Sequence, residues 1–398
     1  MRSSPEIPIR RLAISNYRSI LNLVLPLGRL NVITGANGSG KSNLYRALRL
    51  LADTAQGTVV NALATEGGLG SAFWAGPERL SRKMKAGIDP VEGGIRKKRK
   101  RLRLGFSGNP FGYSISLGLP AMEQPPKSAF FLDPEIKREA IWLGDRYRAA
   151  LTLIDRDRSE VKARTTDGKL QLHDHVEPYD SMLSQVADPA NAPEAMLLRE
   201  SIRGWRFYDY LRTDPDSPAR RPQVGTFTPV LSRDGCDLPA AVQTIFEVGD
   251  RVGFDQAIEG AFPGSRVSVT IRDGTLFELA FEQHGLLRPL TGAELSDGTL
   301  RFLMLTAALF TPRPPALLVL NEPETSLHLD LLPTLAQQIV RAAEHSQVWV
   351  VTHSEPLLNA MNENAECNMI RLRKDCGQTE MVGQDLVDKP TWRWPDNV

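Results

Sequence analysis

The chain has 398 residues, 41% of them hydrophobic and 24% charged, with a formal net charge of +1, values ordinary for a globular protein with a sizeable core. Its three cysteines are spaced in no pattern that suggests a disulfide framework or a metal knuckle. No stretch approaches the roughly 18 apolar residues of a membrane span, and the N-terminal residues lack the apolar core of a signal peptide, so we expect a cytoplasmic protein with no membrane partner.

The N-terminal segment predicts three strands, Ile9–Tyr17, Ile20–Leu25 and Leu30–Thr34, followed by a helix over Ser42–Leu51. Between the third strand and the helix, Gly35–Ser42 has the complete spacing G-x-x-x-x-G-K-S of a phosphate-binding loop. Its glycines allow the backbone N–H groups to point at phosphate oxygens, and the helix N-terminus adds a favourable field. The residues predicted to contact the nucleotide here are Gly35, Ala36, Asn37, Gly38, Ser39, Gly40, Lys41, Ser42 and Asn43. The sequence therefore predicts binding of a nucleoside triphosphate.

Within this loop two side chains have separate predicted roles. Lys41 is expected to reach the β- and γ-phosphates, and the Ser42 hydroxyl is expected to ligate Mg²⁺. The predicted cofactors are therefore ATP and Mg²⁺.

A strongly basic segment follows. From Arg79 to Arg103 the chain has eleven Lys or Arg residues and two acidic ones, a balance of +9, so the remaining residues carry −8. Periodicity fades from about Thr54 to Gly118, which predicts mobile loops with short elements, including a strand at Arg101–Phe106. The run Arg96–Arg103 would attract a phosphate backbone, in duplex DNA rather than single strands because no aromatic residues are interleaved. A solvated loop without a partner is the alternative.

The middle of the chain predicts two hairpins and a helix. Ala150–Arg164 and Lys169–His173 flank the turn residues Asp167-Gly168, and Val267–Arg272 and Leu276–Phe281 flank Asp273-Gly274. A helix is expected at Leu238–Val248. Within this region His173-Asp174-His175 has residues able to ligate a metal, although alternation on a strand favours a polar surface.

The C-terminal part predicts a regular α/β pattern. Ala316–Leu320 and Gln347–Thr352 are continuous apolar strands, with a helix at Leu329–Glu344 between them. Such strands are typical of a sheet covered on both faces.

Three C-terminal segments, taken with the loop, resemble the motifs of ABC-type ATPases. Leu295–Phe302 resembles the signature motif, Leu317–Glu324 a Walker B strand ending in acids, and Val350–Ser354 the strand end that carries the switch histidine. Ser15-Asn16-Tyr17-Arg18 before the loop, the Asn-Glu-Pro-Glu segment and Thr-His-Ser resemble the SMC/RecF/OLD-like branch. The resemblance covers about Ile9–Leu51 and Glu294–Leu358. It implies a P-loop NTPase of mixed α/β fold, an ABC-type ATPase head with a mixed sheet, an antiparallel β subdomain and an inserted helical lobe.

The resemblance also implies residue roles. Glu322 is expected to orient or deprotonate the attacking water, and His353 to reach the γ-phosphate. Ser296 and Gly298 are expected to contact the γ-phosphate bound to a second protomer, so that a homodimer encloses two ATP molecules. Arg18 is expected either to touch the nucleotide or to cap a turn. A glutamine loop has no clear position, with Gln223 and Gln243 as candidates.

Asn321 departs from the family pattern, which has Asp at this position. An amide oxygen can accept a bond from Mg²⁺-bound water but brings no charge. We therefore expect Mg²⁺-dependent ATP binding with slow or partner-stimulated hydrolysis, unless Glu324 supplies the missing charge.

These observations predict three parts, residues 1–60 with the loop, 61–285 as an insertion, and 286–398 with the later motifs. The loop and the later motifs are expected to share one site. Two functions compete, a DNA-associated ATPase of repair, recombination or mobile-element defence, and an ATP-gated dimerisation switch that regulates an effector protein without DNA contact. The insertion and the Tyr17-Arg18 start argue against a transporter domain.

Overall fold

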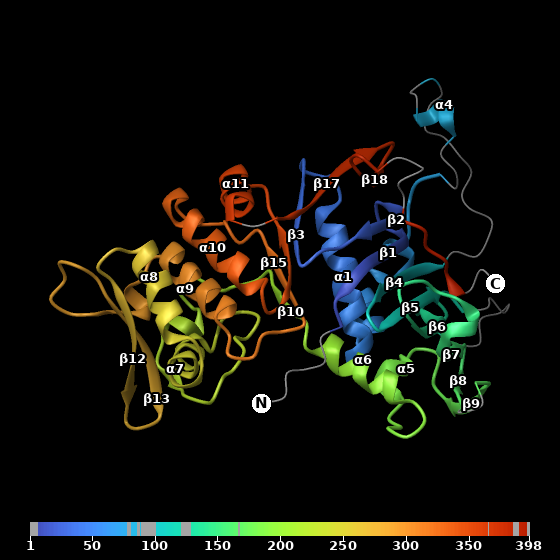
Figure 1. Ribbon diagram of the computed structural model, residues 1–398, viewed down its shortest axis with the longest axis horizontal. Helices are drawn as coiled ribbons and strands as arrows, with labels where there is room; N and C mark the ends of the chain where they lie inside the picture. The colour runs from blue at the N-terminus through green and yellow to red at the C-terminus, as the bar shows by residue number, and fades with distance from the viewer. Residues whose placement is uncertain are drawn as a thin grey trace. The chain divides into compact units, whose positions relative to one another are not determined.

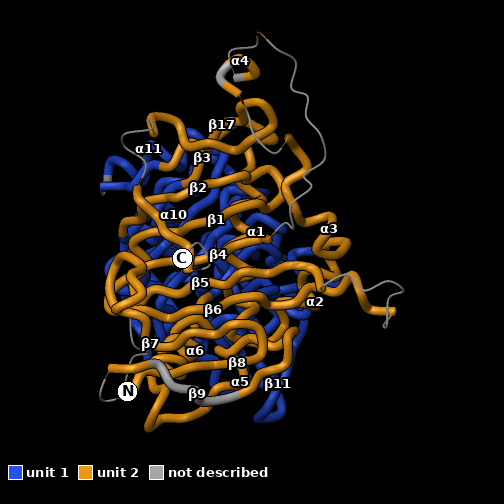
Figure 2. The backbone as a smooth tube through the Cα atoms, turned by 90° about the vertical axis from the view of Figure 1, so that its right-hand side faces the viewer, with its two compact units in different colours: residues 1–3, 29–32, 206–369 blue, residues 4–28, 33–205, 370–398 orange. Residues whose placement is uncertain are grey.

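The computed structural model describes residues 7–77, 81–85, 88, 101–120, 129–165, 168–364, 366–384 and 390–395 (Figure 1). Two compact units are distinguished by their internal contacts (Figure 2). Unit 1 comprises residues 1–3, 29–32 and 206–369, and unit 2 comprises residues 4–28, 33–205 and 370–398. The three-part division expected from the sequence stays a prediction.

Unit 2 contains the phosphate loop and a large antiparallel sheet. Its elements in chain order are β1 (Ile9–Tyr17), β2 (Ile20–Pro26), the second half of β3 (Leu30–Gly35), α1 (Lys41–Gln56), α2 (Val59–Thr65), α3 (Gly68–Ala72), α4 (Arg82–Lys85), β4 (Leu102–Gly108), β5 (Phe111–Gly118), β6 (Glu135–Leu143), η1 (Ala149–Leu151), β7 (Thr152–Asp157), β8 (Glu160–Arg164), β9 (Leu170–His175), α5 (Met182–Gln185), α6 (Pro193–Arg203), β17 (Asn368–Asp375) and β18 (Gln378–Met381).

The large sheet of unit 2 has the strand order β2-β1-β4-β5-β6-β7-β8-β9, with antiparallel neighbours throughout. Helix α1 contacts β1 and β4 of this sheet and also packs against α2, α5 and α6 (Figure 1). Every residue of β5 is buried, so both faces of the central strands are covered. In the same unit, β17 and β18 lie beside β3 in the order β3-β17-β18. The helix that follows the loop is thus anchored to a broad, rigid scaffold.

One sequence expectation for unit 2 was wrong, and another was incomplete. Residues 54–118 were expected to be mobile loops with short elements, and α2, α3, β4 and β5 are such elements, although only a strand near β4 was predicted individually. Their apolar residues were too few per element to give a clear period, yet Val59, Leu63 and Leu69 are fully buried. Ala150–Arg164 is not one strand, because Arg158 adopts a φ of 55° and turns the chain between β7 and β8. The strand expected near Arg101 is confirmed as β4, and Asp167 lies outside the described residues.

Unit 1 contains the acidic strand end and the predicted signature helix. Its elements in chain order are the first half of β3, β10 (Arg206–Tyr208), η2 (Pro218–Arg220), β11 (Gln223–Val224), α7 (Leu238–Val248), α8 (Arg251–Ala261), β12 (Arg266–Arg272), β13 (Leu276–Glu282), β14 (Leu290–Thr291), η3 (Gly292–Glu294), α9 (Asp297–Leu309), β15 (Leu317–Asn321), η4 (Leu329–Leu331), α10 (Leu332–Ala342), β16 (Gln347–Val351) and α11 (Glu355–Asn364).

The strands of unit 1 form two groups. One has the order β10-β15-β16-β3, in which β15 pairs in parallel with both β10 and β16. The other is a small antiparallel sheet of β11, β12, β13 and β14, against which α7 and α8 pack (Figure 1). The hairpin predicted around Asp273-Gly274 is confirmed as β12–β13. The sheets, together with the helices α7–α9, confirm the predicted mixed α/β class with an antiparallel subdomain.

Helix α9 is buried along its length, while its N-terminal residues are not. Leu300, Phe302, Leu303 and Met304 have no solvent exposure and belong to the main core of this unit. A helix that is apolar on all sides is expected at the centre of a core. Its first turn is therefore presented to solvent by a helix that cannot easily shift. None of the helices in the described part of the chain is long and apolar enough to cross a bilayer.

Candidate nucleotide-binding site

The phosphate loop in unit 2 follows β3 directly and ends at the first residue of α1. Gly35, Gly38 and Gly40 have φ values of 147°, 78° and 107°, in the left-handed region that favours glycine. A Cβ on Gly40 would collide with the Thr379 side chain, and one on Gly35 would collide with the Leu372 carbonyl. The tip of the loop is exposed, whereas Ser39 and Gly40 are buried. The glycines therefore serve both the curvature of the loop and its close packing on β17 and β18.

Lys41 lies inside this loop rather than in solvent. Only 5% of this residue is exposed to solvent. Its Nζ donates hydrogen bonds to the carbonyls of Gly35 (2.5 Å) and Ala36 (3.1 Å). Ser42, the next residue of α1, is exposed. An ammonium group surrounded by a curled backbone is the arrangement that binds a polyphosphate.

A chain of hydroxyl groups connects the loop with β18. The Asn43 side chain donates to Ser19 Oγ at 2.8 Å, and Ser19 Oγ lies 2.7 Å from Thr379 Oγ1. Thr379 Oγ1 in turn donates to the Ser39 carbonyl at 3.0 Å, and the Thr379 side chain is fully buried. A buried network whose members all have partners rigidifies the groups it joins. The loop is therefore braced by a residue 340 positions further along the chain.

Arg18, expected to touch the nucleotide or cap a turn, is bonded to an acidic side chain within unit 2. Its guanidinium donates to Glu66 Oε2 at 2.9 Å, and Tyr17 donates to the same carboxylate. Burial would lower the pKa of Arg18, but the bonds to Glu66 and Tyr17 outweigh it and raise that pKa above its usual value. Burial, with the charge of Glu66, also raises the pKa of Tyr17. Contact between Arg18 and nucleotide stays a prediction.

In unit 1, the predicted acidic residues follow β15. Asn321 is opposite Val351 in the parallel pair β15–β16, so Glu322 and His353 emerge at the same edge of the sheet. Glu322 Oε1 lies 3.2 Å from His353 Nε2, and the two side chains are 44% and 38% exposed. A carboxylate and an imidazole at the carboxyl ends of neighbouring strands are accessible to a ligand and able to move a proton.

The backbone of Glu322 is held in an unusual conformation. Its φ is 48°, which in non-glycine residues costs about 1–3 kcal/mol and is concentrated at functional sites. Its N–H donates to the Val351 carbonyl at 2.8 Å, and its own carbonyl accepts from Arg301 of α9 at 3.2 Å. Burial lowers the pKa of Arg301, an effect that the nearby Glu324 and Glu322 carboxylates oppose. The strain is thus maintained by two bonds from within the unit.

Glu324 holds the segment that carries the histidine. Its Oε1 accepts from the Thr352 hydroxyl (2.7 Å) and from the N–H groups of His353 (2.9 Å) and Ser354 (3.2 Å). Hydrogen bonds to an ionised acceptor are stronger than neutral ones. This carboxylate therefore fixes the backbone at His353, and its Oε2 is buried without a protein partner.

The predicted signature residues lie at the start of α9. Ser296 is the N-cap residue, and its Oγ accepts from the Thr299 N–H at 3.1 Å. A Cβ on Gly298 would lie 2.7 Å from the carbonyl of Ser326, a residue with a φ of 64° in the loop after Glu324. Only glycine permits this approach. The first turn of α9 and the loop after β15 are therefore in contact within unit 1.

The other residues singled out from the sequence either lie outside the described residues or make only local contacts. Arg96–Lys100 and the side chains of His173 and Asp174 lie outside the described residues. Gln223 donates to Pro218 and Gln243 to Glu247, both local bonds. Among the residues described, no three His, Cys, Asp or Glu side chains are grouped to hold a metal.

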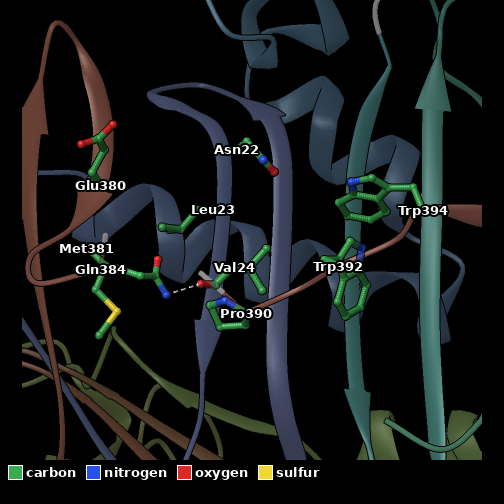
Figure 3. Close-up of a pocket in the computed structure, with 9 residues that line it drawn as sticks. All are labelled: Asn22, Leu23, Val24, Glu380, Met381, Gln384, Pro390, Trp392 and Trp394. Carbon is green, nitrogen blue, oxygen red and sulfur yellow. Dashed lines mark hydrogen bonds between the residues drawn. The ribbon is translucent and has the colours of Figure 1, made fainter. Parts of the chain in front are cut away.

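A cavity of about 270 Å³ lies in unit 2 (Figure 3). Strand β2 forms one side, and Glu380 and Met381 of β18 another, while Trp392 and Trp394 line it from the C-terminal segment. Gln384 bridges to β2 by donating to the Val24 carbonyl at 3.1 Å. None of the loop residues from Gly35 to Ser42 lines this cavity.

Sequence reasoning missed the residues that hold the site in place. Ser19 and Thr379 belong to none of the recognised motifs, and Arg301 lies in the signature segment without a predicted role; their partners are remote in the chain. The spacing within a motif identifies groups that meet a ligand, but contacts over 20 to 360 residues leave no local pattern.

Comparisons with known proteins agree with the motifs. The family described as "AAA domain, putative AbiEii toxin, Type IV TA system" matches residues 30–360. A search of curated proteins found no match. Among solved structures, the Smc head bound to the C-winged helix domain of ScpA is 14% identical, covering 94% of this chain and 97% of that chain with a TM-score of 0.49. The SMC head domain from Thermotoga maritima is also 14% identical, covering 94% and 98% with a TM-score of 0.46. The chain belongs to this AAA-domain family, which confirms the P-loop ATPase that its motifs predict.

Proposed function

We propose that this protein hydrolyses ATP, forms a homodimer around the nucleotide, and acts on duplex DNA. The observation that carries hydrolysis is the exposed pair of Glu322 and His353, 3.2 Å apart at the carboxyl ends of two adjacent parallel strands. The buried amine of Lys41 inside the phosphate loop supports triphosphate binding.

The chemistry is phosphoryl transfer to water. Lys41 and the loop N–H groups bind the β- and γ-phosphates, and Glu322 orients the attacking water and accepts its proton. His353 donates to a γ-phosphate oxygen and is kept in place by Glu324 through the backbone bonds at residues 352–354. The side chain of Glu322 is 44% exposed, so water can reach its carboxylate beside His353.

Mg²⁺ fits the residues available. We propose that the exposed Ser42 hydroxyl and the partly buried Asn321 amide would each offer Mg²⁺ a neutral oxygen donor, a kind of ligand that suits a hard cation. When bound, Mg²⁺ supplies charge neutralisation at the phosphates. Because neither donor is charged, we propose that hydrolysis is slow unless a partner stimulates it.

In the proposed homodimer, Ser296 and Gly298 of one protomer contact the γ-phosphate on the loop of the other. The exposed N-terminal turn of α9, supported by a fully buried helix body, favours this role. Such a turn presents unpaired N–H groups to an anion.

The test replaces Glu322 with Gln. ATP turnover is expected to fall about 10²- to 10⁴-fold, the usual contribution of a general base, while ATP binding persists and the dimer accumulates. Phosphate release measures ATP turnover, and the mass from light scattering in the presence of ATP and Mg²⁺ measures dimer formation. The exposed Glu344, changed to Gln, is the matched control. Turnover as fast as in the unchanged protein would remove the proposed base.

The DNA partner is supported by the +9 charge balance of residues 79–103. We expect affinity for duplex DNA to fall steeply with salt, and the salt dependence to weaken when Arg96–Arg103 are neutralised. Binding measured across salt concentrations separates this from the second function. If duplex DNA does not bind, or if its affinity depends neither on salt nor on the substitutions, the result would favour a switch that regulates an effector protein.

A further inference from the structure

Arg220 lies immediately beside the signature turn of unit 1 and has a role in no recognised motif. It ends the short helix η2, and only 8% of its side chain is exposed. A guanidinium has five N–H donors, and here all are engaged. The acceptors are the carbonyls of Thr213, Asp214, Gly292 and Leu295 and the carboxylate of Asp297.

Three of these bonds reach the residues that precede or begin α9. Arg220 donates to the Gly292 carbonyl at 3.1 Å, to the Leu295 carbonyl at 2.6 Å and to Asp297 Oδ1 at 2.6 Å. Gly292 also approaches η2 closely, because a Cβ there would lie 2.8 Å from the Ala219 carbonyl. One side chain therefore holds the backbone before Ser296 and the carboxylate of the residue after it.

Asp297 creates an electrostatic problem that this contact solves. It is the first residue of α9, and its side chain is 61% exposed. The N-terminus of a helix has a partial charge of about +0.5, which attracts anions, but a carboxylate with a full negative charge at the same place would repel them. The guanidinium of Arg220, at 2.6 Å, cancels that charge.

We propose that Arg220 is a positioning residue for the signature turn, which makes the N-terminus of α9 able to accept the γ-phosphate of ATP held by a second copy of this chain. It acts by fixing the carbonyls of Gly292 and Leu295 and by neutralising Asp297. This inference rests on the proposed ATP-dependent homodimer and identifies a residue on which that homodimer depends.

The experiment uses the full chain with Glu322→Gln, in which ATP is consumed only slowly, and measures the dimer dissociation constant with ATP and Mg²⁺ by sedimentation. Adding Arg220→Gln is expected to weaken dimer association about tenfold or more. The substitution leaves the negative charge of Asp297 uncompensated at the interface, where it repels the γ-phosphate. Adding Asp297→Asn to that protein is expected to recover about threefold or more, because the repelling charge is removed. The neighbouring Arg221, which is 63% exposed, serves as the control when changed to Gln.

The recovery separates positioning of charge from simple loss of structure. A purely structural role for Arg220 would not be repaired by Asp297→Asn, so absence of recovery overturns the inference. If Arg220→Gln does not fold, Asp297→Asn alone carries the test. We expect it to strengthen association at low salt, and weaker association would contradict the proposal.

Failure of the proposed function gives a different result. If the Glu322→Gln protein stays monomeric with ATP, the homodimer itself is wrong. If it dimerises and Arg220→Gln dimerises equally well, only the role of Arg220 is wrong.

Discussion

In unit 2 the phosphate loop is fixed by fully buried contacts, whereas in unit 1 the acidic strand end is fixed by charged groups that are only partly buried. Three glycines with positive φ and the fully buried Thr379 hydroxyl hold the loop. One carboxylate oxygen of Glu324 and one donor of Arg301 hold the residues around Glu322, whose side chain is 44% exposed. Binding of phosphate thus depends on shape set during folding, while the hydrolytic residues depend on polar bonds that solvent and ligands can alter.

The largest expected effect comes from removing the buried charge of the loop. Lys41→Met should weaken ATP binding by about 100-fold or more, because bonds to charged groups are worth about 1.5–3 kcal/mol each. Titration with a fluorescent ATP analogue measures the dissociation constant. The exposed Arg46 on the same helix, changed to Met, should bind almost normally. Equal loss in both variants would show that general charge, not the loop, attracts the nucleotide.

A smaller change is expected at the acidic strand end. Asn321→Asp should lower the Mg²⁺ concentration needed for half-maximal turnover by about tenfold, because a carboxylate adds a charge near the cation. Steady-state ATPase assays across Mg²⁺ concentrations measure it. A fast unchanged enzyme that gains nothing from this substitution would contradict the weakened metal site.

The brace between the loop and β18 should contribute less. Thr379→Val keeps the side-chain volume but removes a hydroxyl that joins Ser19 to the Ser39 carbonyl, and should lower the free energy of unfolding by about 1 kcal/mol. ATP affinity should fall about threefold with it. Denaturant unfolding and nucleotide titration measure the two effects, with the exposed Thr391→Val as control. Unaltered affinity would mean that the loop keeps its shape without the brace.

The smallest effect is a pH dependence in unit 1. Bonds from Arg288 and the Thr291 N–H lower the pKa of Glu294, in the turn η3 before α9, to about 2 from its ordinary 4.5. A carboxyl group with a lowered pKa stabilises the fold above its unfolded pKa, and this stability is lost as pH falls from about 4.5 through about 2. Glu294→Gln should therefore flatten the acid limb of a thermal-stability profile in that window. An unchanged slope would show that the contact does not stabilise η3.

The sequence predicted those helices and strands that contain a motif or a clear hydrophobic periodicity of their own. The loop with β3 and α1, the strands β15 and β16 and the hairpin β12–β13 all follow from periodicity, glycines and turn residues. Within residues 54–118, β4 was predicted but β5 was not, because β5 is buried on every residue and shows no alternation.

The candidate site shows the same limit. The positions of Glu322 and His353 at two strand ends were predictable from the strands and a family resemblance, but the bonds to Glu324 from residues 352–354 depend on the exact path of a loop. Arg220 and Thr379 depend on contacts between segments far apart in the chain, which no window of sequence contains.

The contact between Thr379 and the loop has a consequence for the order of events during synthesis. The ribosome completes Gly35–Ser42 more than 300 residues before it adds the residue that donates to the Ser39 carbonyl. A nascent chain whose β18 segment has not yet left the ribosome lacks this hydrogen bond, although it already contains every residue of the phosphate loop. Tight ATP binding should therefore be a late property of the growing polypeptide, acquired when the β17–β18 hairpin docks rather than when the nucleotide motif leaves the ribosome.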